Sequence, residues 1–130
     1  MKRSVLIFGF VILLSIVNAA SAQDSQRIQF ERGKNAATVK GTTGEYGVSY
    51  VVKAKAGQKI AVTLTPVSGI GIKIDTDNGG YVLLKEEKGG SYEVDLDQDG
   101  DYEIFVGSTN HRSKAFTLVV KITKAKLSEI

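Results

Sequence analysis

Residues 57–75 read GQKIAVTLTPVSGIGIKID, and they carry the clearest strand pattern of the chain. In both halves of it, apolar side chains occupy every second position, and they are Ile60, Val62 and Leu64, then Ile70, Ile72 and Ile74. Alternation with a period of two is typical of a β-strand that buries one face and exposes the other. A proline, a serine and a glycine stand between the two halves, which is a turn composition. We therefore expect two successive strands, the first of which ends at Pro66.

The same alternation extends in both directions from this stretch. Seven further short runs are separated by segments rich in Gly, Asn and Asp, and they are residues 28–30, 38–40, 48–54, 81–84, 92–96, 102–106 and 116–122. No segment between them shows sustained helical periodicity. Eight to nine short strands are too many for one open sheet, so we predict an all-β fold, a two-sheet antiparallel β-sandwich of jelly-roll type. We expect its core to include Tyr50, Tyr92, Tyr102 and Phe116.

The first 22 residues form a predicted secretory signal peptide. Two basic residues precede the apolar run 4–17, and Ala20-Ser21-Ala22 has the A-x-A form of a cleavage site. The apolar run is shorter than the roughly 20 residues of a membrane span. We expect cleavage after Ala22, a single β-sandwich domain over residues 23–130, and a periplasmic or secreted protein without a stable membrane anchor.

The composition excludes several classes of protein. The 130 residues include no cysteine and one histidine, so we expect no disulfide and no ordinary zinc or iron–sulfur site. Removing Lys2 and Arg3 with the leader lowers the formal net charge from +3 to +1. A charge this small predicts no nucleic-acid partner. The oligomeric state stays open.

The strand order also predicts which loops share an end of the sandwich. Because each strand runs from one end to the other, successive loops alternate between the two ends. One end then carries the loops 32–36, 56–58, 76–80 and 97–100. The other end carries the loops 41–47, 66–69, 85–89 and 107–114. The first set is rich in aspartate and the second in basic side chains, so we expect an acidic end and a mixed-basic end.

The aspartates of the first end allow two interpretations. Carboxylates at alternate positions followed by a glycine can wrap oxygen ligands around Ca²⁺. The candidate ligands are Asp75, Asp77, Asp97, Asp99 and Asp101. An EF-hand loop starting at Asp95 would need a glutamate at its twelfth position, where Val106 stands. The alternative, which we favour, is a solvated hairpin turn at Asp99-Gly100 and no cofactor.

No pattern of catalytic residues is present. There is no Gly-x-Ser-x-Gly elbow and no cysteine nucleophile. His111 lies in the polar segment 108–113, which is either a plain exposed loop or a binding loop on a rigid scaffold. Tyr46 is likewise either a binding anchor or a cover for the mouth of the sandwich. We expect a protein that is not an enzyme.

Several segments together resemble a known family. They are Ile28-x-Phe30-x-x-Gly33, Ala37-Thr-Val-x-Gly41, YVVKAKAGQKI at residues 50–60, Gly100-Asp101-Tyr102-x-Ile104-x-Val106 and Phe116-x-Leu118-x-Val120. In this order they are similar to the periplasmic inhibitors of goose-type (g-type) lysozyme. They also resemble the wider set of domains related to the bacterial pre-peptidase C-terminal module. The resemblance covers nearly all of residues 23–130.

The resemblance to the inhibitors implies a binding protein that inserts projecting loops into the active-site cleft of a g-type lysozyme or another wall-degrading enzyme. On the positions that match those loops it implies a partner-binding set of Glu45, Tyr46, Asn110, His111, Arg112 and Lys114. Arg112 would meet an acidic cleft and Tyr46 would act as an aromatic anchor. Two alternatives stay open. One is a carbohydrate- or cell-wall-binding module of the pre-peptidase C-terminal type, with or without calcium, and the other is an envelope protein that shares only the scaffold.

Overall fold

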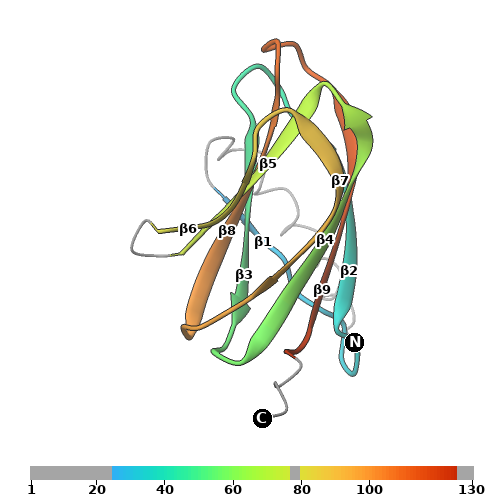
Figure 1. Ribbon diagram of the computed structural model, residues 1–130. Helices are drawn as coiled ribbons and strands as arrows, with labels where there is room; N and C mark the ends of the chain where they lie inside the picture. Colours follow the sequence, from blue (N-terminus) through green and yellow to red (C-terminus); the bar gives the residue numbers. More distant parts are fainter. Residues whose placement is uncertain (1–24, 77–79, 126–130) are drawn as a thin grey trace, which may run out of the picture.

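The computed structural model describes residues 25–76 and 80–125. The predicted signal peptide (1–22) and Asp77 lie outside these residues. Within the described ranges the chain forms β-strands (Figure 1), and no helix is long and apolar enough to cross a membrane. The strands are β1 (Gln26–Arg27), β2 (Ala36–Thr42), β3 (Val48–Ala54), β4 (Gln58–Ser68), β5 (Ile70–Thr76), β6 (Tyr81–Lys85), β7 (Lys88–Asp95), β8 (Gly100–Ser108) and β9 (Ala115–Lys124).

The strands form two facing sheets, which confirms the predicted all-β sandwich (Figure 1). The five-stranded sheet has the order β1-β3-β8-β5-β6, and the four-stranded sheet has the order β2-β9-β4-β7. From β2 to β9 the chain changes sheet at every connection except the one between β5 and β6. Eight strands that alternate in this way between two antiparallel sheets make a jelly roll. β1 is an addition to it, and among the described strands its pairing with β3 is the one parallel ladder.

The first strand begins earlier than its apolar residues predict. β1 pairs with β3 through Gln26 and Arg27, and the N–H of Ile28 donates to the carbonyl of Val51 at 2.8 Å. Ile28 is buried, whereas Phe30 is partly buried against the core outside the ladder. The burial expected for Ile28 is therefore correct, and Phe30 packs partly buried against the core. The strand expected at residues 28–30 lies instead at residues 26–27.

The prediction that Pro66 ends its strand is wrong. β4 continues through Pro66 to Ser68. Its register against β7 shifts between Leu64 and Ser68, so the proline lies in an irregular part of the ladder. A proline has no N–H to donate, and strands tolerate it at such irregular positions.

The core lies between the two sheets, where the alternating positions point inward. Among the described residues, eight are 0% exposed, and they are Ile60, Leu64, Ile70, Ile74, Ile104, Val106, Leu118 and Val120. Tyr50, Tyr102 and Phe116 are buried as predicted, and Tyr92 is partly buried against the core. The rings of Tyr50 and Phe116 meet edge to face with their centres 6.3 Å apart. Burial raises the pKa of Tyr50.

Hydrogen bonds between loops show which loops share an end. The N–H of Thr43 donates to the carbonyl of Lys114 at 3.0 Å, and the N–H of Thr109 donates to the carbonyl of Gly69 at 3.1 Å. We call this end, residues 43–47, 66–69 and 108–114, the loop tip; it is at the top of Figure 1. These three segments, of which 66–68 is the end of β4, are ones that the alternation places together, so their shared position is confirmed.

The opposite end is held by a second set of bonds. The N–H of Gly57 donates to the carbonyl of Leu96 at 2.9 Å, and the N–H of Leu96 donates to the carbonyl of Gln58 at 2.8 Å. We call residues 55–58 and 96–101 the turn end. The predicted hairpin at residues 95–101 is wrong, because β7 pairs with β4 whereas β8 pairs with β3 and β5. The segment instead crosses from one sheet to the other. Turn residues do not reveal whether a turn joins two paired strands or crosses between sheets.

Candidate binding site at the loop tip

Thr43 joins two loops of the tip. Its side chain is buried, and its hydroxyl accepts a hydrogen bond from the N–H of Lys114 at 3.1 Å and donates to the carbonyl of Gly44 at 2.9 Å. Together with the bond from the Thr43 N–H to the Lys114 carbonyl, these contacts fix the two loops relative to each other. Nothing in the sequence singles out Thr43, because threonine is common in glycine-rich loops.

Asn110 organises the loop before β9. Its Oδ1 accepts hydrogen bonds from the hydroxyl of Ser108 at 2.8 Å and from the backbone N–H of Arg112 at 3.0 Å. His111, which follows it, has a φ of 62°, in the left-handed region that residues other than glycine seldom adopt. The side-chain oxygen of Asn110 is thus occupied by hydrogen bonds inside the loop. The Nδ2 group of the same side chain is the part that can bind another molecule.

Tyr46 and Arg112 are exposed on these two loops. The Tyr46 side chain is 84% exposed, and Glu45, His111 and Arg112 are exposed as well. Over residues 25–76 and 80–125, the Arg112 guanidinium makes no ion pair and the Tyr46 hydroxyl makes no hydrogen bond. The loop tip therefore offers an aromatic ring and a guanidinium that the protein itself does not use.

Lys114 is placed differently from the other predicted site residues. It is half-buried, and its Cε and Nζ lie 3.2 Å from the position that a Cβ on Gly69 would occupy. Gly69 has a φ of 81° and no side chain, so the Lys114 side chain lies across it. The structure brings all six predicted residues to one end, with Lys114 packed on the neighbouring loop.

At the turn end, two of the five candidate calcium ligands, Asp99 and Asp101, already have partners. The Oδ1 of Asp99 accepts a hydrogen bond from the N–H of Ala56 at 2.9 Å. Both oxygens of Asp101 accept from the Arg27 guanidinium, at 3.1 and 2.9 Å. In the part of the chain that the structure describes, no group of three or more His, Asp or Glu side chains is placed to hold a metal ion. A calcium ion here would have to displace these partners.

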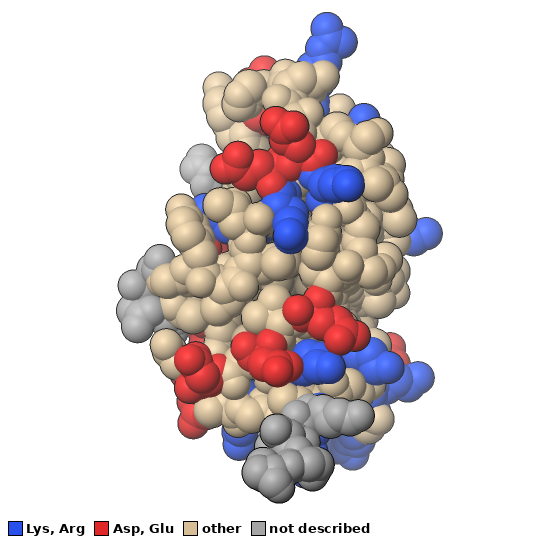
Figure 2. Space-filling model, viewed as in Figure 1, with Lys and Arg blue, Asp and Glu red and all other residues tan. Residues whose placement is uncertain are grey.

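The charges are more mixed than the loop residues alone predict. Figure 2 shows acidic and basic side chains next to each other in both halves of the viewed face. Near the turn end, the Lys59 Nζ lies 3.2 Å from the Glu93 carboxylate. The hydrogen bond and the charge of Arg27 lower the pKa of Asp101. The expected acidic end was inferred from the loop residues alone. The strands add basic side chains near that end, and these include Arg27 and Lys59.

Side chains exposed on loops that a β-sandwich holds in place are a common arrangement at binding sites. Three solved structures of periplasmic inhibitors of g-type lysozyme share its fold. PliG from Aeromonas hydrophila matches with a TM-score of 0.69 at 22% identity, over 76% of this chain and 96% of that one. PliG from Salmonella Typhimurium matches with a TM-score of 0.60 at 22% identity, over 77% of this chain and 98% of that one. A mutant of Escherichia coli PliG matches with a TM-score of 0.59 at 19% identity, over 78% of this chain and 100% of that one.

The chain thus has the fold of the PliG inhibitors, which confirms the resemblance at the level of the fold. No protein-family model matches the chain, and no curated protein matches its sequence.

Proposed function

We propose that this chain is an exported binding protein, without catalytic activity, that inhibits a g-type lysozyme by inserting the loop tip into its active-site cleft. One observation carries the proposal. Tyr46 and Arg112 stand exposed and unpartnered, among the described residues, on two loops that Thr43 holds together. The fold shared with three inhibitors of this enzyme supports it. Export to the periplasm or beyond rests on the predicted signal peptide.

Arg112 supplies the charge that such a cleft requires. Glycoside hydrolases carry a pair of carboxyl groups beside the scissile bond. A planar guanidinium matches a carboxylate with two parallel hydrogen bonds, and such bonds are stronger than those between neutral groups. Arg112 can make them because no carboxylate in the described part of the chain pairs with it. Occupying the cleft is sufficient for inhibition, and no covalent bond changes.

Tyr46 supplies the apolar contact. An aromatic ring that is 84% exposed in the free protein can bury most of its surface on binding. Tyrosine gives a large contact area for few rotatable bonds, which is why it is frequent among the residues that dominate interfaces. Glu45, His111 and the Nδ2 group of Asn110 would add hydrogen bonds at the rim, and Lys114 would add charge beside Gly69.

The direct test is a lysis assay in which residues 23–130 are added to a g-type lysozyme acting on bacterial cells. We expect the protein to slow lysis at about micromolar concentration. Arg112→Ala and Tyr46→Ala should each raise the inhibition constant about tenfold or more, because truncating a dominant interface residue costs about 2 kcal/mol. Arg32→Ala is the matched control, since Arg32 is an exposed arginine in the loop that precedes β2, away from the tip.

Two outcomes would contradict the proposal. No slowing of lysis by the wild-type protein would end the inhibitor hypothesis. An unchanged constant for folded Arg112→Ala would remove Arg112 from the mechanism. Arg112→Lys separates charge from shape, because a lysine keeps the charge and loses the planar fork; we expect it to recover only part of the inhibition.

A further inference from the structure

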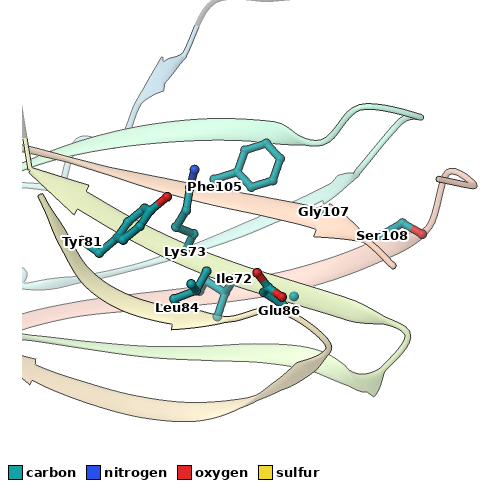
Figure 3. Close-up of a pocket in the computed structure, with 9 residues that line it drawn as sticks. Ile72, Lys73, Tyr81, Leu84, Glu86, Phe105, Gly107 and Ser108 are labelled. Atoms are coloured by element: carbon teal, nitrogen blue, oxygen red, sulfur yellow. The ribbon is translucent and has the colours of Figure 1, made fainter. Parts of the chain in front are cut away.

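The outer face of the five-stranded sheet carries a hollow that is separate from the exposed side chains of the loop tip. It lies over β5, β6 and β8 and has a volume of about 290 Å³ (Figure 3). Small-molecule sites usually start at about 300 Å³, so the hollow has room for a single ring rather than a large ligand. Neither Tyr46 nor Arg112 lines it.

Two glycines form the floor of the hollow. Gly71 on β5 is the register partner of Gly107 on β8. A Cβ on Gly107 would come within 2.9 Å of the Phe105 ring, and one on Gly71 would clash with the carbonyl oxygen of Glu86. The ring of Phe105 and the chain at Glu86 therefore close in over bare backbone. Glycine at both positions lets the Phe105 ring and the backbone of residues 85 and 86 pack directly against the two strands, and this packing shapes the hollow.

Two aromatic rings and a lysine form one wall. The Lys73 Nζ lies 5.3 Å from the centre of the Phe105 ring and 5.6 Å from that of the Tyr81 ring. Figure 3 shows the ammonium group between the two rings. Cation–π attraction of this kind holds the ammonium in place as a hydrogen-bond donor. Tyr81 is 63% exposed and Leu84 is 43% exposed, so apolar surface beside the donor is open to solvent.

The charges around the hollow decide the class of ligand. Lys73 is positive, and the carboxylate of Asp75 lies 3.6 Å from its Nζ, while Glu86 lines the hollow as well. Asp75 offsets the charge of Lys73, and Glu86 is the one carboxylate among the lining residues, so no cluster of like charges is present to select an ion. A neutral molecule with several hydroxyl groups can accept from Lys73 and donate to Glu86. Its C–H groups can lie against the rings and Leu84, where apolar contact is favourable.

We propose that this hollow binds a neutral pyranose sugar, as one ring of an oligosaccharide, between the wall of Lys73, Tyr81 and Phe105 and the carboxylate of Glu86. The affinity expected for one ring in a shallow site is weak, with a Kd of about 1 mM. The proposal does not depend on lysozyme inhibition, because it uses different residues on a different face.

The test is a titration of the ¹⁵N-labelled protein with chitotriose and, separately, cellotriose, followed by ¹H–¹⁵N NMR. We expect the amide signals of Gly71 and Gly107 to shift and to saturate at about 20 mM sugar or below. Lys73→Met keeps the length of the side chain and removes the donor, and Tyr81→Ala removes one ring. Each should weaken binding about tenfold. Tyr46→Ala, on the loop tip, is the matched aromatic control and should bind like the wild type.

Absence of saturable shifts with both trisaccharides would overturn the proposal. So would binding that persists unchanged in both Lys73→Met and Tyr81→Ala, with spectra that show each variant folded. A failure here would leave the lysis assay unaffected, and Tyr81→Ala should still slow lysis. The two proposals can therefore fail separately.

Discussion

The turn end and the loop tip of the sandwich use polar residues for different purposes. At the turn end, the Asp99 carboxylate accepts from the Ala56 N–H, and the Gln58 side-chain oxygen accepts from the Lys55 N–H at 2.8 Å. At the loop tip, internal bonds also fix the loops, yet Tyr46 is left exposed without a partner in the described structure. The turn end pairs these two side chains internally, whereas the loop tip leaves Tyr46 and Arg112 without partners among the residues that the structure describes.

This difference shows why a conspicuous pattern in the sequence does not by itself locate a binding site. The five aspartates that the sequence predicts at one end are a stronger pattern than a single arginine. In the structure Asp99 and Asp101 stabilise the protein's own turns and strands, whereas Arg112 has no ion-pair partner in the part of the chain that is described. A pattern of polar residues therefore indicates a binding site only where the fold leaves those residues unpaired.

The largest effect on stability is expected from the link that fixes the loop tip. Thr43→Val keeps the shape of the side chain but leaves the N–H of Lys114 buried without its acceptor. We expect the free energy of unfolding to fall by about 1–3 kcal/mol, measured by urea denaturation. Thr42→Val, at an exposed position at the end of β2, is the matched control and should change stability by less than about 0.5 kcal/mol. Equal changes in the two variants would show that the link does not hold the tip.

A smaller effect is expected at the turn end. The hydroxyl of Tyr102 donates to the carbonyl of Gln98 at 2.7 Å, and burial raises the pKa of Tyr102, so the donor stays protonated. Tyr102→Phe should lower the free energy of unfolding by about 1 kcal/mol, or the Tm by about 4–8 °C. Tyr46→Phe removes a hydroxyl with no partner in the described structure and should leave the Tm unchanged. A similar loss in both variants would contradict the contrast between the ends.

The smallest effect is a dependence on pH at the exposed pair of Arg27 and Asp101. Arg27 lowers the pKa of Asp101 below its ordinary value of 3.8, so the folded state favours the ionised carboxylate. The stabilisation is present above pH 3.8 and is lost as the pH falls through the lower folded pKa. Wild type and Asp101→Asn should therefore differ in stability near neutral pH and converge in acid, and salt should reduce the difference. A difference that persists in acid would mean that the pair is not its origin.

Much of the fold could be predicted from the sequence. The alternation in residues 57–75 correctly predicted that Ile60, Leu64 and Ile70 are buried, because in a strand successive side chains point to opposite faces. The meeting of segments 43–47, 66–69 and 108–114 at one end also followed from counting strands. Strand pairing could not be predicted, because turns that join paired strands and turns that cross between sheets use the same residues. The end of β4 was predicted wrongly at Pro66, because an irregular part of a ladder accepts a proline that a regular part would not.

Only part of the candidate site could be found in this way. The resemblance pointed to Tyr46 and Arg112, and both are exposed at the loop tip. It could not show that Thr43 joins their loops, because Thr43 and Lys114 are far apart in the chain. The hollow over Gly71 and Gly107 was equally hidden, since its floor exists only where β5 and β8 lie in register.

The amino-acid sequence was enough to predict the fold class, the inward-facing residues and the meeting of segments 43–47, 66–69 and 108–114 at one end. Each of these depends on local periodicity and on the order of elements along the chain. The tertiary structure alone decided which strands pair, which carboxylates are neutralised and which side chains stay unpartnered. These properties depend on contacts between residues distant in sequence, and no local pattern encodes such contacts.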